Sequence, residues 1–371
     1  MTPPVQPLNL RQLRVWPLAQ RESLTRAEDV LLAPETPPPP CPERILPLID
    51  DCAKNIRAAR ARGATVLLLY GAHLLRNGAA AILDRLMERR WLTHLGTNGA
   101  GTIHDWEYAW LGASTESVEK NVATGTFGSW DETGANLHLA LLAGALDGLG
   151  YGRALGRFIS EDGAHLPSPS ELTDAIAAHP AHPLTAARAD LLGAMHARGW
   201  PGGRRVVQHR WPHASILASA WRHGVPLTVH PGIGYDIIAN HPLFNGAAIG
   251  RAAELDFALL GGSLDRLDGG VVLSVGSAIM GPQVFEKSLS CVHNLRRQAG
   301  RDIVRGHTFY VVDLQDGGGW DWTQGEPPKT HPAYYLRFCK TYSRMGGAMH
   351  YAQCDNTTFI HHLYHELCTT R

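Results

Sequence analysis

Short apolar runs alternate with amphipathic stretches along most of the chain. Residues 66–70 and 271–275 are almost wholly apolar, which is typical of strands buried on both faces of a parallel sheet. Residues 45–62 and 79–90 place apolar side chains at helical spacing. Strands that alternate with helices, and end in glycine-bearing loops, predict an α/β fold with a doubly wound, mostly parallel sheet and helices on both faces.

Other stretches give weaker patterns. We expect a turn at residues 71–78, an irregular excursion at 150–168 and a helix over 170–199. Residues 1–44 are proline-rich at both ends and include four consecutive prolines, which favour an extended segment. We interpret residues 1–44 as an arm laid over the body or over a neighbouring subunit, with disorder as the alternative, and residues 45–371 as one folded domain.

One stretch combines a strand, a small-residue turn and a helix. The apolar run Val271–Val275 is followed by Gly276 and Ser277, and Pro282 stands where the first turn of a helix would fall. Free backbone N–H groups at such a turn form the usual cradle for a phosphate or a dinucleotide. An ordinary strand-to-helix connection without a ligand is the alternative interpretation.

Composition excludes some classes of protein. The 371 residues carry 34 basic and 34 acidic side chains and are 44% hydrophobic. Zero formal charge argues against a dedicated nucleic-acid or membrane-surface binder, and no apolar run reaches the length of a membrane span. The beginning of the sequence lacks the apolar core of a signal peptide. The six cysteines form no CxxC pair, so we expect free thiols in a reducing cytoplasm.

Polar residues gather in the loops that follow the expected strands, where ligands of such sheets bind. They are Asn98, His104, Asp105, His230, Asp236, Asp313, Asp316 and Asp321. Acids beside Trp320 and Trp322 could hold an amine by charge pairing and a cation–π contact. Asp and Gly also favour turns for purely structural reasons, which is the alternative.

Three further patterns suggest chemistry. Lys340 stands among aromatic residues, where loss of solvent could make it an imine-forming nucleophile; a lysine reaching solvent from a helix is the alternative. His361 and His365 are one helical turn apart but lack a third metal ligand. His104 and Asp105 could belong to a metal-dependent hydrolase. GxSxG and P-loop motifs are absent.

With these loops placed, residues 45–367 resemble the deoxyhypusine synthase family and its bacterial deoxyhypusine synthase-like members. The resemblance is carried by an ordered series of loops: 71–78 (GAHLLRNG), 97–105 (TNGAGTIHD), 226–236 (PLTVHPGIGYD), 276–281 (GSAIMG), 313–319 (DLQDGGG) and the turn at Asp355.

The resemblance implies a Rossmann-like homotetramer that binds NAD near its subunit interfaces. In the family, an aminobutyl group passes from spermidine, through an imine on a lysine, to an acceptor amine. By position Lys340 looks like that lysine and Asp236 like the substrate-binding aspartate, while His230, Trp320 and Asp321 are further candidates for the substrate. The residues that would line the NAD site are Asn77, Thr97, Asn98, Gly99, Gly276, Ser277, Asp313 and Asp355.

The sequence departs from the family around the substrate. Tyr334, Tyr335 and Phe338 replace the acid and tryptophan that precede the family's lysine, and Pro282 stands where true synthases have a histidine. The expected activity is therefore an NAD-dependent aminoalkyl transferase of polyamine metabolism, whose acceptor is a protein lysine or a free amine such as putrescine. A catalytically lapsed protein that binds NAD or polyamine in a regulatory role is the alternative.

Overall fold

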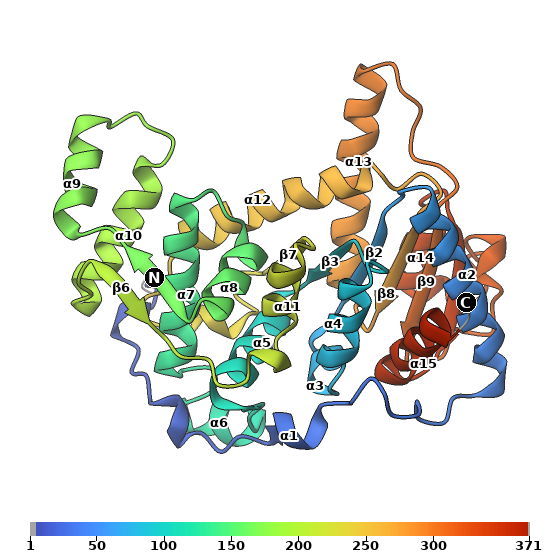
Figure 1. The fold of residues 1–371 in the computed structure, drawn as a ribbon, viewed down its shortest axis with the longest axis horizontal. Coiled ribbons are helices and arrows are strands. Elements are labelled where there is room, and N and C mark those ends of the chain that lie inside the picture. Colours follow the sequence, from blue (N-terminus) through green and yellow to red (C-terminus); the bar gives the residue numbers. More distant parts are fainter. Residues whose placement is uncertain (1–4, 370–371) are drawn as a thin grey trace.

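The computed structural model describes residues 5–369 and is built around one six-stranded sheet (Figure 1). The first residues of the arm, 1–4, lie outside the described part. All neighbouring strands of this sheet are parallel, in the order β10-β9-β8-β2-β3-β7. Their bounds are β2 Val66–Tyr70, β3 His94–Thr97, β7 Leu227–Val229, β8 Val271–Val275, β9 Thr308–Asp313 and β10 Ala348–Gln353.

The sheet has the doubly wound strand order of a Rossmann-like fold. The chain begins it in the middle with β2, adds β3 and β7 on one side, and then returns to add β8, β9 and β10 on the other side. The order reverses between β2 and β8, and such a reversal opens a crevice at the carboxyl ends of the two strands. The predicted fold class is therefore confirmed.

Each face of the sheet has its own hydrophobic core, because alternate strand residues point to opposite sides. Val66 and Leu68 of β2 belong to a core with α2, α4 and α15, whereas Leu67 and Leu69 belong to a core with α12, α13 and α14. All five residues of β2 are buried. The helices that cover the two faces are α2 Leu46–Ala61, α4 Ala80–Glu88, α12 Gly246–Leu264, α13 Met280–Gln298, α14 Arg337–Ser343 and α15 Asn356–Thr369.

The long connection between β3 and β7 forms a second group of helices beside the sheet (Figure 1). It contains α5 Gly99–Leu111, α6 Val118–Thr124, α7 Asp131–Leu146, α8 Tyr151–Ser160, α9 Pro169–Ala178, α10 Thr185–Arg198 and α11 Ile216–His223. Strands β5 Gly163–Leu166 and β6 Gly203–Val206 pair antiparallel, and α9 and α10 project from the body beside them.

Three predictions from local sequence were wrong in this region and near β2. Residues 71–78 contain a helix, α3 Ala72–Arg76. The expected helix over 170–199 is divided between α9 and α10, since Pro180 and Pro183 interrupt it. The excursion at 150–168 contains α8, whose Gly152 is required for close packing: a Cβ there would lie 2.0 Å from the carbonyl oxygen of Leu227.

The proline-rich arm lies along the body, past α6 and α3, and leads to α2 (Figure 1). Its strand β1 Thr25–Arg26 pairs antiparallel with β4 Ala113–Ser114. Short helix α1 Ala27–Val30 follows, and the Leu32 N–H donates to the Gly78 carbonyl. Further on, the Pro39 carbonyl accepts a hydrogen bond from His362. The arm thus contacts β4, the end of the 71–78 segment and helix α15.

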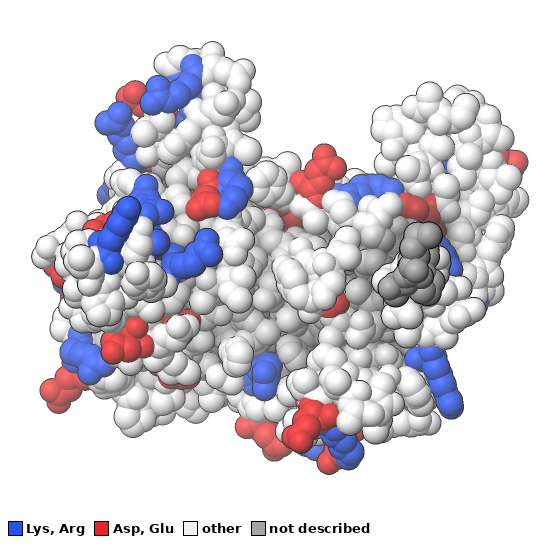
Figure 2. Space-filling model, turned by 180° about the vertical axis from the view of Figure 1, so that it is seen from behind, with Lys and Arg blue, Asp and Glu red and all other residues white. Residues whose placement is uncertain are grey.

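Surface and length give two further observations. On the face shown in Figure 2, basic and acidic side chains are interspersed and most of the surface is uncharged. Among residues 5–369, none of the helices combines the length and the apolar character needed to cross a bilayer.

Candidate active site at the carboxyl edge of the sheet

The crevice between β2 and β8 is formed by two glycines in direct contact. A Cβ on Gly71 would lie 2.1 Å from the carbonyl oxygen of Gly276, and the Gly71 N–H donates to the Val275 carbonyl. Gly276 has φ +60°, and a Cβ there would lie 2.3 Å from Nδ2 of Asn356. Both positions therefore require glycine, one for close approach and the other also for its left-handed backbone.

The turn after β8 presents unused hydrogen-bond donors at the start of a long helix. Within the described part of the chain, the backbone N–H groups of Ser277, Ala278 and Ile279 donate no hydrogen bond. The hydroxyl of Ser277 accepts from the Gly281 N–H at 3.0 Å and so caps α13. Free N–H groups together with the positive end of a helix dipole suit a phosphate group. This turn fits the pyrophosphate of a dinucleotide.

The residues expected to line the NAD site all lie near this edge, but their roles differ. Asn98 caps α5 by accepting from the Gly101 N–H, and Gly99 is the first residue of that helix. Thr97 is fully buried and donates to the Tyr70 carbonyl, so its hydroxyl ties β3 to β2. Asn77 is exposed at the end of α3.

Two carboxylates stand at the ends of β9 and β10. Asp313 accepts from the Gln315 N–H at 3.1 Å, and Asp355 accepts from the Thr358 N–H at 2.8 Å in the first turn of α15. Both side chains are half-buried. These residues lie at one edge of the sheet because every strand of the sheet runs in the same direction.

Beside the crevice lies a cavity of about 260 Å³ with several ionisable residues in its lining, which we call the His104 cavity. It is lined by α5, α3, the 115–127 segment, the connection after β7 and the arm. Its charged and titratable lining residues are Arg21, Arg76, His104, Glu107, Glu116, Tyr235 and Asp236. A concave site with several ionisable groups beside the carboxyl ends of parallel strands is the expected place for a substrate.

A chain of hydrogen bonds fixes the proton on His104. Ser114 donates its hydroxyl proton to Glu107 at 2.6 Å, so the 2.7 Å contact between Ser114 Oγ and His104 Nδ1 places the imidazole proton on Nδ1. Nε2 is then the basic nitrogen. Burial lowers the pKa of His104 to about 4, and the ring is therefore neutral near pH 7. His104 therefore offers Nε2 to the cavity as a hydrogen-bond acceptor.

Glu107 connects this series of hydrogen bonds to the arm. Its Oε1 accepts from Arg21 Nη1 at 2.7 Å and from the Thr133 hydroxyl at 3.0 Å. The side chains of Arg21 and Glu107 are 2% and 1% exposed, so this is a buried ion pair. An unpaired charge at this depth is very costly, and the arm residue Arg21 is therefore needed wherever Glu107 is ionised.

Asp236 lies at the other end of the cavity lining, against the start of α5. Its Oδ2 accepts from the Gly232 N–H at 2.7 Å, and the backbone of Ala100 also donates to the carboxylate. A Cβ on Gly99 would lie 2.2 Å from Oδ2, so glycine is needed there. Burial raises the pKa of Asp236, while these backbone donors oppose the rise.

Within one chain, the other expected substrate residues lie elsewhere. Trp320 and Asp321 line a separate cavity of about 400 Å³ with Arg44 from the end of the arm. Lys340, on α14, is not among the residues that line the His104 cavity, and its Nζ lies 3.7 Å from the centroid of the Tyr334 ring. The family resemblance implies that these residues and Asp236 line one substrate pocket, and within a single chain they do not.

His230 is hydrogen-bonded to a strand residue of the sheet. Its Nε2 lies 3.1 Å from the Thr228 hydroxyl, which also lies 3.1 Å from His94 Nε2. Burial lowers the pKa of His230 to about 4. These contacts form a chain of side chains from His94, which is buried, to His230, which is partly buried, and they hold the His230 ring against the sheet.

The two metal hypotheses find no support. Asp105 accepts from the Ser215 hydroxyl and from the backbone N–H groups of Ile216 and Leu217, so it caps α11 from a distance. His365 hydrogen-bonds to carbonyls of the arm. In the described range, residues 5–369, there is no group of three or more His, Cys, Asp or Glu side chains that could hold a metal ion.

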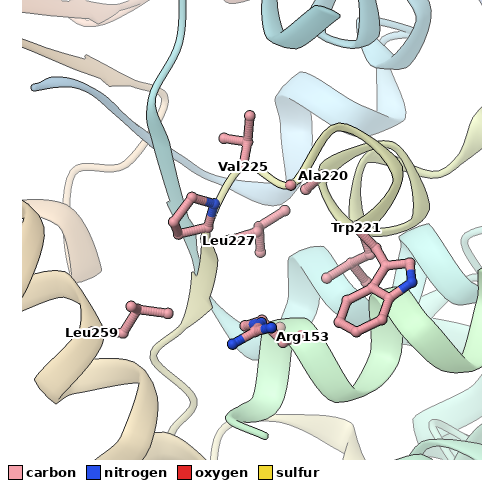
Figure 3. Close-up of a pocket in the computed structure, with 10 residues that line it drawn as sticks. Arg153, Ala220, Trp221, Val225, Leu227 and Leu259 are labelled. Atoms are coloured by element: carbon pink, nitrogen blue, oxygen red, sulfur yellow. The ribbon is translucent and has the colours of Figure 1, made fainter. Parts of the chain in front are cut away.

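A third pocket lies at the opposite end of the sheet. It has a volume of about 360 Å³ and is lined mainly by apolar residues from α8, α11, α12 and the start of β7 (Figure 3). Arg153 is its charged member and lies 5.6 Å from the Trp221 ring. Because this pocket is beside the amino end of β7, it is not at the ligand-binding edge of the sheet.

Sequence reasoning missed three charged members of the His104 cavity: Arg21, Arg76 and Glu107. A signal existed for Glu107, since it stands three residues after His104 and so shares one helix face with it. Arg76 belongs to a loop that carried the family resemblance. Arg21 stands in the arm, whose path the local pattern does not define.

Comparisons with known proteins add little to this geometry. No protein-family model matches the chain, and no curated protein matches it. Among solved structures, unliganded AgrE is 13% identical over 88% of this chain and 33% of its own, with a TM-score of 0.43. ArgZ, an arginine dihydrolase from the ornithine–ammonia cycle in cyanobacteria, is 12% identical over 86% of this chain and 32% of its own, with a TM-score of 0.39.

A complex of AgrE with ornithine and NAD+ gives 13% identity over 88% of this chain and 34% of its own, with a TM-score of 0.40. The chain thus spans about a third of the length of these proteins. At such TM-scores the similarities carry no argument for an activity. The sheet and its site define the chain as a Rossmann-like α/β protein with a candidate ligand site at the carboxyl edge.

Proposed function

We propose that the protein is an NAD-dependent enzyme that acts on an amine. The observation that supports this most directly is the glycine-bearing turn at the strand-order reversal, where Ser277, Ala278 and Ile279 present free N–H groups. The His104 cavity lies beside it, with the Asp236 carboxylate in its lining to hold an ammonium group. The chemistry supplied by a bound NAD+ is acceptance of a hydride from the carbon beside the amine nitrogen.

The more specific proposal is aminoalkyl transfer from a spermidine-type donor. It rests on the loop series shared with the deoxyhypusine synthase family. The Lys340 amine would attack the oxidised carbon and release the first amine, and an acceptor amine would then displace Lys340 before the hydride returns. In the single chain Lys340 contacts the Tyr334 ring, so this proposal requires that a second copy, as in a homotetramer, bring Lys340 to a substrate cavity.

These proposals have one direct test. Purified protein is incubated with NAD+, spermidine and putrescine, reduced with borohydride, and analysed by mass spectrometry for diaminopropane, homospermidine and a modified lysine. We expect products and an adduct on Lys340, absent in Lys340→Ala and unchanged in Lys287→Ala, which alters an exposed lysine on α13. Light scattering on the same sample measures the oligomeric state. Absence of NAD+ binding would refute the enzyme proposal altogether.

A second candidate is a regulatory protein that binds NAD or polyamine without turnover. The separation of Lys340 from the cavity of Asp236 within one chain favours it. In that case NAD+ would raise the melting temperature, while borohydride would trap no adduct and Lys340→Ala would bind NAD+ as the wild type does.

A further inference from the structure

The charged groups that line the His104 cavity differ in how many hydrogen bonds they already form. Glu107 accepts from Arg21, Thr133 and Ser114. Glu116 likewise accepts three hydrogen bonds, from the Asn121 amide, the Gly128 N–H and the Trp130 indole. A carboxylate has about four acceptor positions, so these two side chains are nearly saturated by the protein.

Arg76 is the opposite case. Its guanidinium forms no hydrogen bond and no ion pair with any residue between 5 and 369, although the side chain is half-buried and its Nε is shielded from solvent. An arginine carries five N–H donors and stays charged at any ordinary pH. A guanidinium that lines a cavity with all its donors free is a ready partner for an anionic group, above all a carboxylate.

Asp236 is the lining carboxylate with the most spare capacity. Both of its protein partners are backbone N–H groups, of Gly232 and Ala100, and no cation lies within 4.0 Å of it in the described range. Asp236 and Arg76 thus face the same cavity with opposite charges and do not pair with each other.

We propose that the His104 cavity binds a small amine that also carries a carboxylate, with Arg76 holding the carboxylate and Asp236 the ammonium group. A molecule with both charges would satisfy both side chains at once, and 260 Å³ suits a metabolite of amino-acid size. A linear polyamine would place only positive charge beside Arg76. The inference rests on the proposed function only in taking this cavity as the substrate site.

The recognition chemistry leads to a matched set of probes. 4-Aminobutyrate and putrescine have the same four-carbon chain but end in a carboxylate and in a second amine, respectively, and butyrate lacks the amine. L-Alanine and L-lysine test α-amino carboxylates. Binding to the full chain is measured by calorimetry without NAD+, and NAD+ is titrated separately into every variant.

We expect at least one amino carboxylate to bind at least tenfold more tightly than putrescine and butyrate. Arg76→Gln should weaken that binding about tenfold or more, with partial recovery in Arg76→Lys, because one charge-assisted pair is lost. Asp236→Asn should weaken it similarly. The control Arg85→Gln removes an arginine on α4 that pairs with Glu88 and should change nothing.

Two results would overturn the inference: tighter binding of putrescine than of every amino carboxylate, or unchanged binding in Arg76→Gln that folds normally by circular dichroism. Failure of all the probes would overturn it as well. If NAD+ binds while the amino carboxylates do not, the cofactor proposal survives alone. If the amino carboxylates bind while NAD+ does not, the cofactor proposal fails and the cavity assignment stands.

Discussion

Replacing Asp105 by alanine tests whether this residue is structural or chemical. The carboxylate is buried and accepts the backbone N–H groups of Ile216 and Leu217, in the first turn of α11, at 2.8 and 3.3 Å. In Asp105→Ala both N–H groups remain buried without an acceptor. Each such group costs ~1–3 kcal/mol, so the free energy of unfolding should fall by ~2–6 kcal/mol, a large part of the ~5–15 kcal/mol typical of a folded protein.

Urea denaturation followed by tryptophan fluorescence measures this loss, since buried Trp106 neighbours Asp105 on α5. The control Asp174→Ala removes an exposed aspartate on α9 and should change stability by at most ~0.5 kcal/mol. If Asp105→Ala unfolds at the same urea concentration as the wild type, the capping role is refuted. Loss of a bound metal without loss of stability would favour the hydrolase hypothesis instead.

The dependence on pH gives an independent check. Burial raises the pKa of Asp105 from 3.8 to about 7, so between these values the folded state holds a proton that the unfolded chain has released. Its contribution to stability is therefore greatest at low pH and decreases as pH rises through that window, by at most ~1.4 kcal/mol per pH unit. Asp105→Asn cannot titrate, and its deficit relative to the wild type should shrink as the pH rises from about 5 to about 8.

Four further outcomes follow from the site and the arm. Gly276→Ala, which forces a Cβ into a position 2.3 Å from a neighbouring side chain at φ +60°, should abolish the rise in melting temperature on adding NAD+. Arg21→Met should lower the free energy of unfolding in urea by ~3–5 kcal/mol, because it leaves a buried carboxylate unpaired. Mild oxidation should join Cys41 to Cys354, whose sulfurs lie 3.9 Å apart, and peptide mapping without reductant would detect the bond. In NMR titrations the ring of His104 should stay neutral above pH ~5, because burial lowers its pKa to about 4; a midpoint near the ordinary ~6.5 would contradict the burial argument.

The fold could be predicted from the sequence because its signals are local. A buried parallel strand such as β2 needs a run of apolar residues. Such a run can be recognised in the sequence without knowing which strands pair with it. The failures occurred where a residue's partner is distant. Residues 150–168 were expected to be irregular, yet they contain α8, in which Gly152 is needed because the backbone of β7 approaches closely there. Asp105 was read as a possible metal ligand, yet it caps a helix more than a hundred residues away.

The same distinction separates the cofactor part of the site from the substrate part. A dinucleotide cradle depends on backbone geometry, so Gly71 and Gly276 reveal it through their spacing after strands and through their need to be glycine. The class of substrate depends instead on which charged side chains remain without an ion-pair partner after folding. A loop motif in the sequence does not predict which charges these are. Arg76 stands within a loop that carried the polyamine resemblance, but only the folded chain shows that its guanidinium has no protein partner and lines the same cavity as Asp236. The family resemblance and the unpaired charges of the folded chain therefore predict different amines, and the binding comparison of amino carboxylates with putrescine decides between them.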